Sequence, residues 1–264
     1  MSFAYDAGNL FNAIRSMNCF RYESMVPEDL RNILASVPLA YLPIGPLEWH
    51  GEHLAYGCDP IRAAWLLENL WKEVGGVLLP TLYLGTDGVK RSGNVELWGM
   101  EMFAGEPLPG GTFLPADVFS AVVSHTLNFL ERNGFRLCIT CTGHQAPEQI
   151  QALEKLESEF QSRTMRVIAW QSGRIIKPDG TPDEIGHAGF EETSELMHID
   201  PALIRPHRIG TAPADQKLGL TPSTLSQASA TAGQQRLELE HRQLKTAVMK
   251  MCREIGLAIL PTQV

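Results

Sequence analysis

Short apolar runs alternate with amphipathic helical segments along this chain, and this alternation is what most limits the folds open to it. Turn residues bound each of the apolar runs, which cover 38–45, 76–84, 136–142 and 165–171. Helical periodicity covers 60–74, 115–133, 147–162 and 230–255. Strands that alternate with helices indicate a mostly parallel sheet with helices on both faces. The sequence therefore predicts an α/β fold, a three-layer αβα sandwich with a mostly parallel central sheet.

Length and charge narrow the class of protein further. The 264 residues contain no internal repeat or linker, so we expect a single domain over 1–264. The net charge is −8, from 22 basic and 30 acidic residues, and there is no basic tract. This argues against nucleic acid or an anionic membrane as a partner. The chain also shows no signal-peptide pattern and no apolar run of membrane-spanning length, which predicts a cytoplasmic protein.

The five cysteines are scattered and odd in number, which predicts no disulfide framework and fits a reducing compartment. Cys138 and Cys141 form a CxxC, but they lie inside an expected strand and no second pair accompanies them. We therefore interpret both as buried structural residues rather than as metal ligands.

Carboxylate and imidazole side chains concentrate directly after the first apolar run. The stretch from Glu48 to Asp59 also contains His50 and His53. Glu48 and His50 are two positions apart, so extended backbone points both side chains the same way. Oxygen donors beside an imidazole can bind Zn²⁺ or Mn²⁺. This stretch predicts part of a hydrolytic metal site.

More such residues follow the later apolar runs, where ligands of α/β sheets usually bind. Taken singly, each has an ordinary structural explanation, and Asp59 before Pro60 would suit a helix N-cap. Their recurrence at separate strand ends predicts two divalent ions per chain, Zn and/or Mn, joined by a bridging carboxylate. The predicted ligands are Glu48, His50, Asp59, His144 and Glu192.

Glycines at 186 and 189 flank His187 and would leave its imidazole exposed, so His187 is predicted to be the general acid that protonates a leaving amine. Glu191 and Glu192 are adjacent and cannot both face the site. His53 is predicted to orient a ligand or substrate, with direct coordination as the alternative.

The segment 85–114 is long, Gly-rich and without clear periodicity, which is typical of a functional loop. Its polar residues Asp87, Lys90 and Arg91 would suit a hydroxylated or acidic ligand.

The motifs resemble those of the creatininase (creatinine amidohydrolase) family over about residues 38–200. The family segments are E-x-H-G-x-H-L-P-x-G-x-D, G-T, N-G-H and H-A-G-x-x-E-T-S. Their counterparts here begin at Glu48, Gly111, Thr142 and His187. The resemblance implies a three-layer α/β hydrolase that uses two divalent metals to open cyclic or linear amides. It also implies a small-molecule substrate and a homo-oligomer, since several family members are hexamers.

Residue by residue, the resemblance implies that Glu48 and His144 bind one metal, that His50 and Glu192 bind the other, and that Asp59 bridges them. His187 matches the acid/base histidine.

The chain departs from the family pattern at several positions. Trp49 replaces a Gln, and Ala146 stands where creatininases carry a metal-binding Glu, with Glu148 as a nearby carboxylate. Gln145 replaces an aromatic residue, and Trp170 is the one recognisable aromatic of a substrate cage. Gln145 and Trp170 are therefore expected to contact the substrate or support the site.

The preferred hypothesis is a dinuclear metal-dependent amidohydrolase, in which a metal-bound hydroxide cleaves a C–N bond of a small cyclic amide, lactam or formamide. The alternative is a metal-dependent lactonase or a hydrolase or isomerase of sugar derivatives on the same scaffold. A third hypothesis, motivated by Ala146, is a non-catalytic binding module.

Overall fold

Four parallel strands form the centre of the protein, whose computed structural model describes residues 21–183 and 185–257. In spatial order they are β2 (Val77–Leu78), β1 (Leu39–Ile44), β5 (Leu137–Thr142) and β6 (Arg166–Gln171). Each neighbouring pair is parallel, with Leu39 opposite Leu137 and Leu137 opposite Arg166. Parallel neighbours need crossover connections, and helices supply them here.

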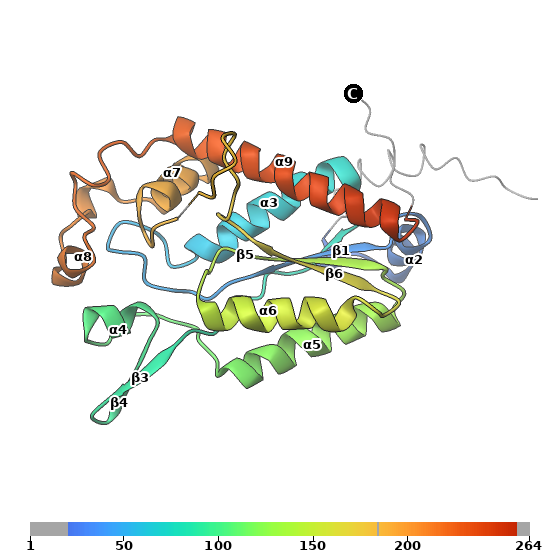
Figure 1. Ribbon diagram of the computed structural model, residues 1–264, viewed down its shortest axis with the longest axis horizontal. Helices are drawn as coiled ribbons and strands as arrows, with labels where there is room; N and C mark the ends of the chain where they lie inside the picture. The colour runs from blue at the N-terminus through green and yellow to red at the C-terminus, as the bar shows by residue number, and fades with distance from the viewer. Residues whose placement is uncertain (1–20, 184, 258–264) are drawn as a thin grey trace, which may run out of the picture.

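Helices cover both faces of the sheet (Figure 1). On one face lie α3 (Cys58–Val74), α7 (Phe190–Ile199) and α9 (Ala230–Glu254), and on the other lie α5 (Ala116–Arg132) and α6 (Pro147–Phe160). Alternate residues of β1 serve the two faces, since Leu39 and Tyr41 pack with α3 and α9 while Ala40 and Leu42 pack with α5 and α6. The predicted three-layer α/β fold is confirmed, and the predicted helices begin and end within two residues of the observed ones.

Two cysteines in β5 illustrate the same alternation. Cys138 packs into the core on the α5 and α6 side, whereas Cys141 packs into the core on the α3 and α9 side. Both are buried and free. Because the sheet separates their side chains, they cannot share a disulfide or a metal ion, which agrees with the structural role expected of them.

The apolar run 76–84 forms less strand than predicted, because only Val77 and Leu78 join the ladder. Pro80 lacks a backbone N–H, so a continuous ladder cannot pass through this position. The chain nevertheless stays beside β1, since Leu82 N donates to Pro43 O at 2.9 Å.

The segment 85–114 is not the irregular loop that its composition indicated. It contains the antiparallel hairpin of β3 (Val89–Ser92) and β4 (Val95–Trp98), which projects from the body, and the short helix α4 (Met100–Ala104). Its ends are tied together, because Gly85 N donates to Thr112 O and Leu114 N donates to Gly85 O. Six of the hairpin's eight strand residues are exposed, so no buried face produced an alternating apolar pattern in the sequence.

The remaining elements in the described part of the chain are no longer than the ten residues of α2. They are η1 (Tyr22–Ser24), α2 (Pro27–Ser36), η2 (Pro201–Leu203), η3 (Pro206–Arg208) and α8 (Pro213–Lys217). Among the residues that the structure describes, no helix combines the length and the apolar character needed to cross a membrane.

Gly233 lets α9 cross α7 at backbone contact distance. A Cβ atom at this position would lie 1.9 Å from the carbonyl oxygen of Ser194 and 2.7 Å from the amide nitrogen of Glu195. The N-cap residue Ser229 adds a second tie, since its amide donates to Ser194 Oγ at 3.2 Å. The start of α9 therefore fixes where α7 lies against the sheet.

Replacing Gly233 with alanine should destabilise the protein, although alanine is favoured over glycine inside a helix by about 1 kcal/mol. The added methyl group would displace backbone, and overpacking of this kind costs about 1–3 kcal/mol. The midpoint of urea unfolding measures the effect. Gln235→Ala, at an exposed position of the same helix, is the control and should change stability by less than about 0.5 kcal/mol. A Gly233→Ala protein as stable as the parent would contradict this packing.

Candidate metal centre

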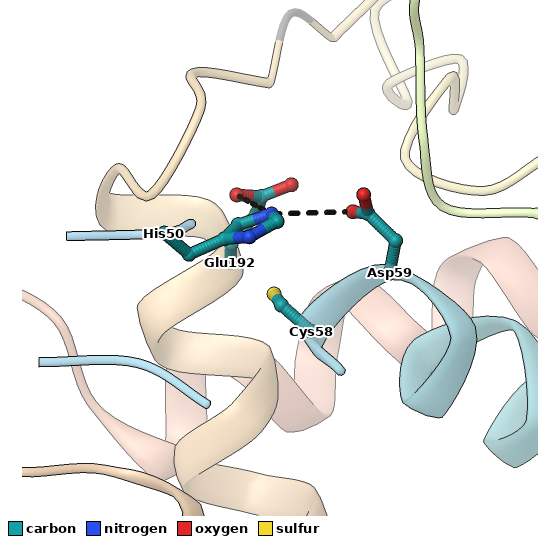
Figure 2. Close-up of side chains that lie close together, drawn as sticks. All are labelled: His50, Cys58, Asp59 and Glu192. Carbon is teal, nitrogen blue, oxygen red and sulfur yellow. Dashed lines mark ion pairs between the residues drawn. The ribbon is translucent and has the colours of Figure 1, made fainter. Parts of the chain in front are cut away.

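The five predicted ligands lie together beyond the carboxyl ends of the strands. Glu48 and His50 belong to the loop after β1, and Asp59 is the second residue of α3. His144 follows β5, and Glu192 is in the first turn of α7. All five side chains are buried, with at most 5% of any residue exposed. Figure 2 shows His50, Asp59 and Glu192 pointing toward one another from separate elements.

Asp59 lies between the two histidines and presents one oxygen to each. Its Oδ2 atom is 3.3 Å from His144 Nδ1, and its Oδ1 atom is 3.4 Å from His50 Nε2. Glu48 Oε2 lies 2.9 Å from His144 Nδ1, and Glu192 Oε2 lies 3.6 Å from His50 Nε2. The donor atoms thus form one group with Glu48 and His144 and a second with His50 and Glu192, and Asp59 belongs to both.

Several of these donor atoms are buried and lack a hydrogen-bond partner in the described part of the chain, among them Glu48 Oε2, His50 Nε2 and Asp59 Oδ2. Buried polar atoms are rarely left without a partner unless a water or an ion serves them. The tautomer of His50 fits the same interpretation. Its Nδ1 lies 3.0 Å from the carbonyl oxygen of Glu48, which can only accept, so in the neutral ring Nδ1 carries the hydrogen and Nε2 offers its lone pair to a cation. The residues present therefore fit a divalent cation.

Electrostatics favour positive charge here. Burial alone would lower the pKa of His50 and His144, but the surrounding carboxylates raise both pKa values well above the ordinary one. Burial would likewise raise the pKa of Asp59, but the two imidazoles hold it well below its usual range. The buried carboxylates therefore favour a positive charge at this place.

Cys58 also lies near His50, Asp59 and Glu192 (Figure 2). Burial, reinforced by Glu192, raises the pKa of its thiol to about 12. That value applies to the protein without a metal ion. A bound divalent cation would deprotonate a coordinating thiol, so Cys58 is a further candidate donor beside His50, Asp59 and Glu192.

Both carboxylate oxygens of Glu192 are held in place. Arg62 Nη1 donates to Oε1 at 3.0 Å, and the amide of Ala188 donates to Oε2 at 2.7 Å. Ala188 has a φ of 52°, in the left-handed region that residues with a side chain seldom adopt. Its backbone is strained in the orientation that directs this amide at Glu192. Glu191 instead lies beside Gly186, which settles which of the adjacent glutamates faces the cluster.

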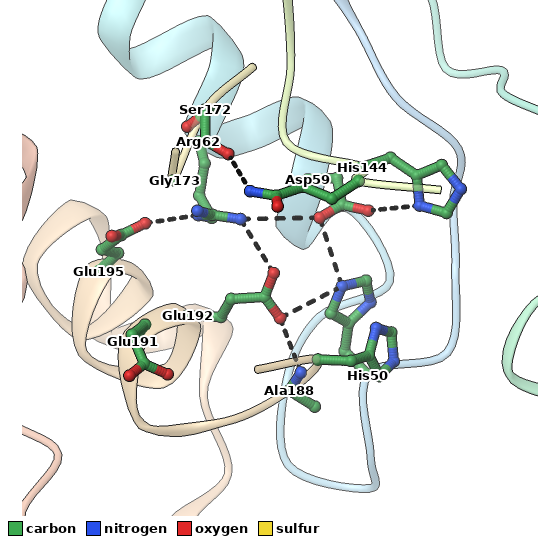
Figure 3. Close-up of polar contacts among 12 residues, drawn as sticks. His50, Asp59, Arg62, His144, Ser172, Gly173, Ala188, Glu191, Glu192 and Glu195 are labelled. Carbon is green, nitrogen blue, oxygen red and sulfur yellow. Dashed lines mark hydrogen bonds and ion pairs between the residues drawn. The ribbon is translucent and has the colours of Figure 1, made fainter. Parts of the chain in front are cut away.

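Arg62 and Glu195 were missed by sequence reasoning. Arg62 is fully buried in α3, and its Nε donates to Glu195 Oε2 at 2.6 Å while its Nη1 lies 3.7 Å from Asp59. Glu195 also accepts from Arg236 of α9 at 2.9 Å. Figure 3 shows Arg62 between the acidic residues of α3 and α7. The available signal was spacing, since Arg62 follows Asp59 by three residues and Glu195 follows Glu192 by three.

The ring of His187 packs against the ring of His50, with centroids 4.2 Å apart and a tilt of 32° between the ring planes. Its Nε2 lies 2.7 Å from the carbonyl oxygen of Trp49, so Nε2 donates and Nδ1 is the nitrogen free to exchange a proton. The structure thus brings His187 to the edge of the cluster, half-buried, with Glu48 and His50 as neighbours.

The three supporting residues predicted from sequence lie farther out. His53 is buried behind α7 with its Nε2 3.2 Å from Thr193 Oγ1, and burial lowers its pKa to about 4, so its ring is neutral. Gln145 donates to Ser172 O at 2.8 Å. Trp170 points toward α9 and donates its indole N–H to Glu240 at 2.9 Å. Thus none of the three is placed in the ligand groups, and their predicted roles stay predictions.

Aromatic side chains beside the cluster come from the 85–114 segment. Trp98 and Phe113 are nearly parallel, with centroids 6.2 Å apart, and Phe113 lies 5.8 Å from the ring of His144. A cavity of about 10 Å³ beside Glu48 is lined by Trp49, Trp98, Met100, Glu101, Leu108, Gly110 and Phe113. Thr112 of the Gly-Thr motif anchors the loop after β1, which carries Glu48 and His50, since Leu47 N donates to Thr112 Oγ1 at 2.7 Å.

Fold and cluster together define an α/β protein of the hydrolase class with a candidate metal centre at its strand ends. Comparison with known proteins identifies the family. The model of the creatininase family, described as creatinine amidohydrolase, matches residues 23–243, and the chain belongs to this family. That membership confirms the predicted resemblance and the predicted class, a hydrolase acting on a non-peptide C–N bond.

Individual relatives are distant. A creatinine amidohydrolase from Pseudomonas putida is 23% identical over 224 residues, which cover 75% of this chain and 82% of that protein. A crystal structure of creatininase superposes with a TM-score of 0.68 at 20% identity, covering 88% of this chain and 97% of that one. A creatininase structure described as the Mn form gives 0.68 at 19% identity, covering 88% and 98%. Other solved creatininases include a Zn–Zn type and a complex with creatine.

Proposed function

We propose that this chain is a dinuclear metal-dependent amidohydrolase that cleaves the C–N bond of a small cyclic amide, lactam or formamide. One observation carries the proposal: the two oxygens of Asp59 face different histidines, so that two ligand groups share this carboxylate. A bridging carboxylate is what two ions a few Å apart require. The Mn and Zn–Zn forms of solved creatininases support the same metals here.

We infer two ion positions from the ligand groups. Glu48 and His144 would hold one ion through Oε2 and Nδ1, and His50 and Glu192 would hold the other, with Asp59 in common. Divalent ions bound there would supply a Lewis acid for a carbonyl oxygen and a water of lowered pKa. The chain's own contribution is to fix Glu192 through the contacts of Arg62 and Ala188 described above.

His187 would protonate the leaving nitrogen. Its Nε2–H is held by the carbonyl of Trp49, so the proton passes through Nδ1 at the edge of the ligand groups. An amine is a poor leaving group until it gains a proton, and a positioned imidazole suits this task at neutral pH.

The walls beside Glu48 favour a small, planar and uncharged substrate. Trp49, Trp98 and Phe113 offer apolar surface, and Glu101, the acidic residue that joins Glu48 in this lining, accepts hydrogen bonds from the amides of Trp98 and Leu108. Lys90 and Arg91, which favoured an acidic or hydroxylated ligand, are exposed on the hairpin.

Metal analysis and a substrate panel test the proposal. Protein purified without chelator should hold about two Zn or Mn ions per chain and should turn over a lactam, cyclic amide or formamide. Exclusive turnover of lactones or sugar derivatives would favour the lactonase or isomerase alternative. Protein that binds no metal and gains no activity on metal addition would contradict the mechanism and favour a binding module.

Replacing His187 with alanine should lower kcat by about 10²–10⁴-fold while the metal content stays that of the parent, because a proton donor is lost and the proposed ligands are not. Steady-state kinetics and metal analysis on the same preparation measure both effects. The control is His125→Ala, which removes an exposed imidazole of α5 and should leave kcat unchanged. A His187→Ala enzyme with full kcat would assign the proton to a different group.

A further inference from the structure

Asp87 faces one of the proposed ligands from a segment far away in the sequence. Its Oδ2 atom lies 3.3 Å from His144 Nε2. The other ring nitrogen of His144, Nδ1, lies 2.9 Å from Glu48 Oε2 and 3.3 Å from Asp59 Oδ2. The two edges of the imidazole therefore face different groups, and Asp87 stands on the edge away from the ligand cluster.

The number of hydrogens on the imidazole of His144 indicates what the contact with Asp87 could do. A neutral imidazole carries one hydrogen, so if Nδ1 binds a cation, Nε2 must carry the hydrogen and requires an acceptor. His144 Nε2 is buried and has no well-aligned hydrogen-bond partner among the described residues. Asp87 is the carboxylate within reach of it, and contacts of this kind often tighten only when a site is loaded.

The surrounding backbone holds Asp87 at this place. Gly88 N donates to Asp87 Oδ1 at 2.6 Å, which leaves Oδ2 for the histidine. Gly99 N in turn donates to Gly88 O at 3.1 Å. Gly99 has a φ of 53°, and a Cβ there would lie 2.7 Å from Asp87 Oδ2 and 3.2 Å from Glu48 Oε1. The end of the hairpin can lie against both carboxylates only because position 99 is glycine.

We propose that Asp87 is a positioning residue, which accepts the Nε2 hydrogen of His144 and thereby keeps Nδ1 directed at the ion held with Glu48 and Asp59. The proposal rests on the proposed function, because it treats His144 as a ligand. It also links the 85–114 segment to the metal centre, so that the hairpin supports a ligand as well as the wall beside Glu48.

Metal binding by Asp87→Ala tests the proposal, with Zn²⁺ affinity measured by chelator competition. Loss of a supporting carboxylate typically weakens metal binding about 10–100-fold, and we expect a loss in this range for the ion held by His144 with Glu48 and Asp59. Asp87→Asn keeps the side-chain shape and guards against misfolding, and it should also bind Zn²⁺ more weakly than the parent. The matched control is Glu96→Ala, which removes an exposed carboxylate of the same hairpin and should not change the affinity.

Cobalt substitution separates positioning from direct coordination. At saturating Co²⁺, the visible spectrum of Asp87→Ala should match that of the parent, because the ligands are the same. A changed spectrum at saturation would make Asp87 a ligand and overturn the positioning role. Parental Zn²⁺ affinity in both Asp87 variants would overturn it as well. Absence of metal binding by the parent protein would instead contradict the proposed function, so the two failures are distinguishable.

Discussion

Asp59→Ala should lose bound metal from both positions and at least about a thousandfold in kcat/KM, or ~4 kcal/mol of transition-state stabilisation. The reason is geometric, since this one carboxylate faces His144 with Oδ2 and His50 with Oδ1. Removing any other proposed ligand would impair one group, whereas removing Asp59 impairs both. Metal content after gel filtration and kinetics on the best substrate of the panel give the two readouts.

Asp117→Ala is a matched control, because Asp117 is the second residue of α5 as Asp59 is of α3, but it is exposed. It should bind metal and turn over substrate like the parent. Asp59→Asn preserves the side-chain shape and separates loss of charge from loss of packing. An Asp59→Ala protein that still holds two ions would show that the groups do not depend on a shared carboxylate.

Arg62→Met should destabilise the protein by about 3–5 kcal/mol, because it leaves buried carboxylates without their counter-charge. The arginine is fully buried and contacts Glu192 at 3.0 Å and Glu195 at 2.6 Å. Burial would lower its pKa, but Glu195 and Glu192 raise it well above the ordinary value, so the guanidinium stays charged. The midpoint of guanidinium chloride unfolding, followed by circular dichroism, measures the loss.

Combining Arg62→Met with Glu195→Met should recover part of the lost stability, since it replaces both partners of one buried pair with apolar groups and removes one of the two carboxylates left without a counter-charge. The control is Arg31→Met, at an exposed position of α2, which should change stability by less than about 0.5 kcal/mol. If Arg62→Met behaved like that control, the arginine could not be the main counter-charge of Glu192 and Glu195.

The sequence predicted the sheet and its covering helices because strands and helices leave different apolar periods, and the strands here are buried on both faces. It failed for 76–84, where Pro80 interrupts the ladder, and for the hairpin of 85–114, whose exposed strands have no apolar face. The periodicity of apolar residues reflects burial against a core, so it does not predict a hairpin that projects from the body of the protein.

The proposed ligands could be named from sequence for two reasons. The segments after neighbouring parallel strands lie at one edge of the sheet, and the motifs that carry these residues resemble those of the creatininase family. The structure places all five within one buried cluster, although their role as ligands remains a proposal. Arg62 and Glu195 could not be paired in advance, since 133 positions separate them and one chain carries no signal of their contact. The assignment of Trp170 to the substrate also has no support in the structure, because its indole faces α9. Oligomeric state and cellular location stay predictions.

The segment 85–114 also affects how a substrate could reach the candidate metal centre and how a product could leave it. The space that this segment leaves beside Glu48, about 10 Å³, is near the size of one water molecule. We therefore expect that a small-molecule substrate can lie beside Glu48 only if the part of 85–114 that lines this space is displaced. In enzymes with such a covering segment, its movement or product release can limit kcat instead of the chemical step. Substitutions in 85–114 would then change kcat without displacing the proposed ligands or His187.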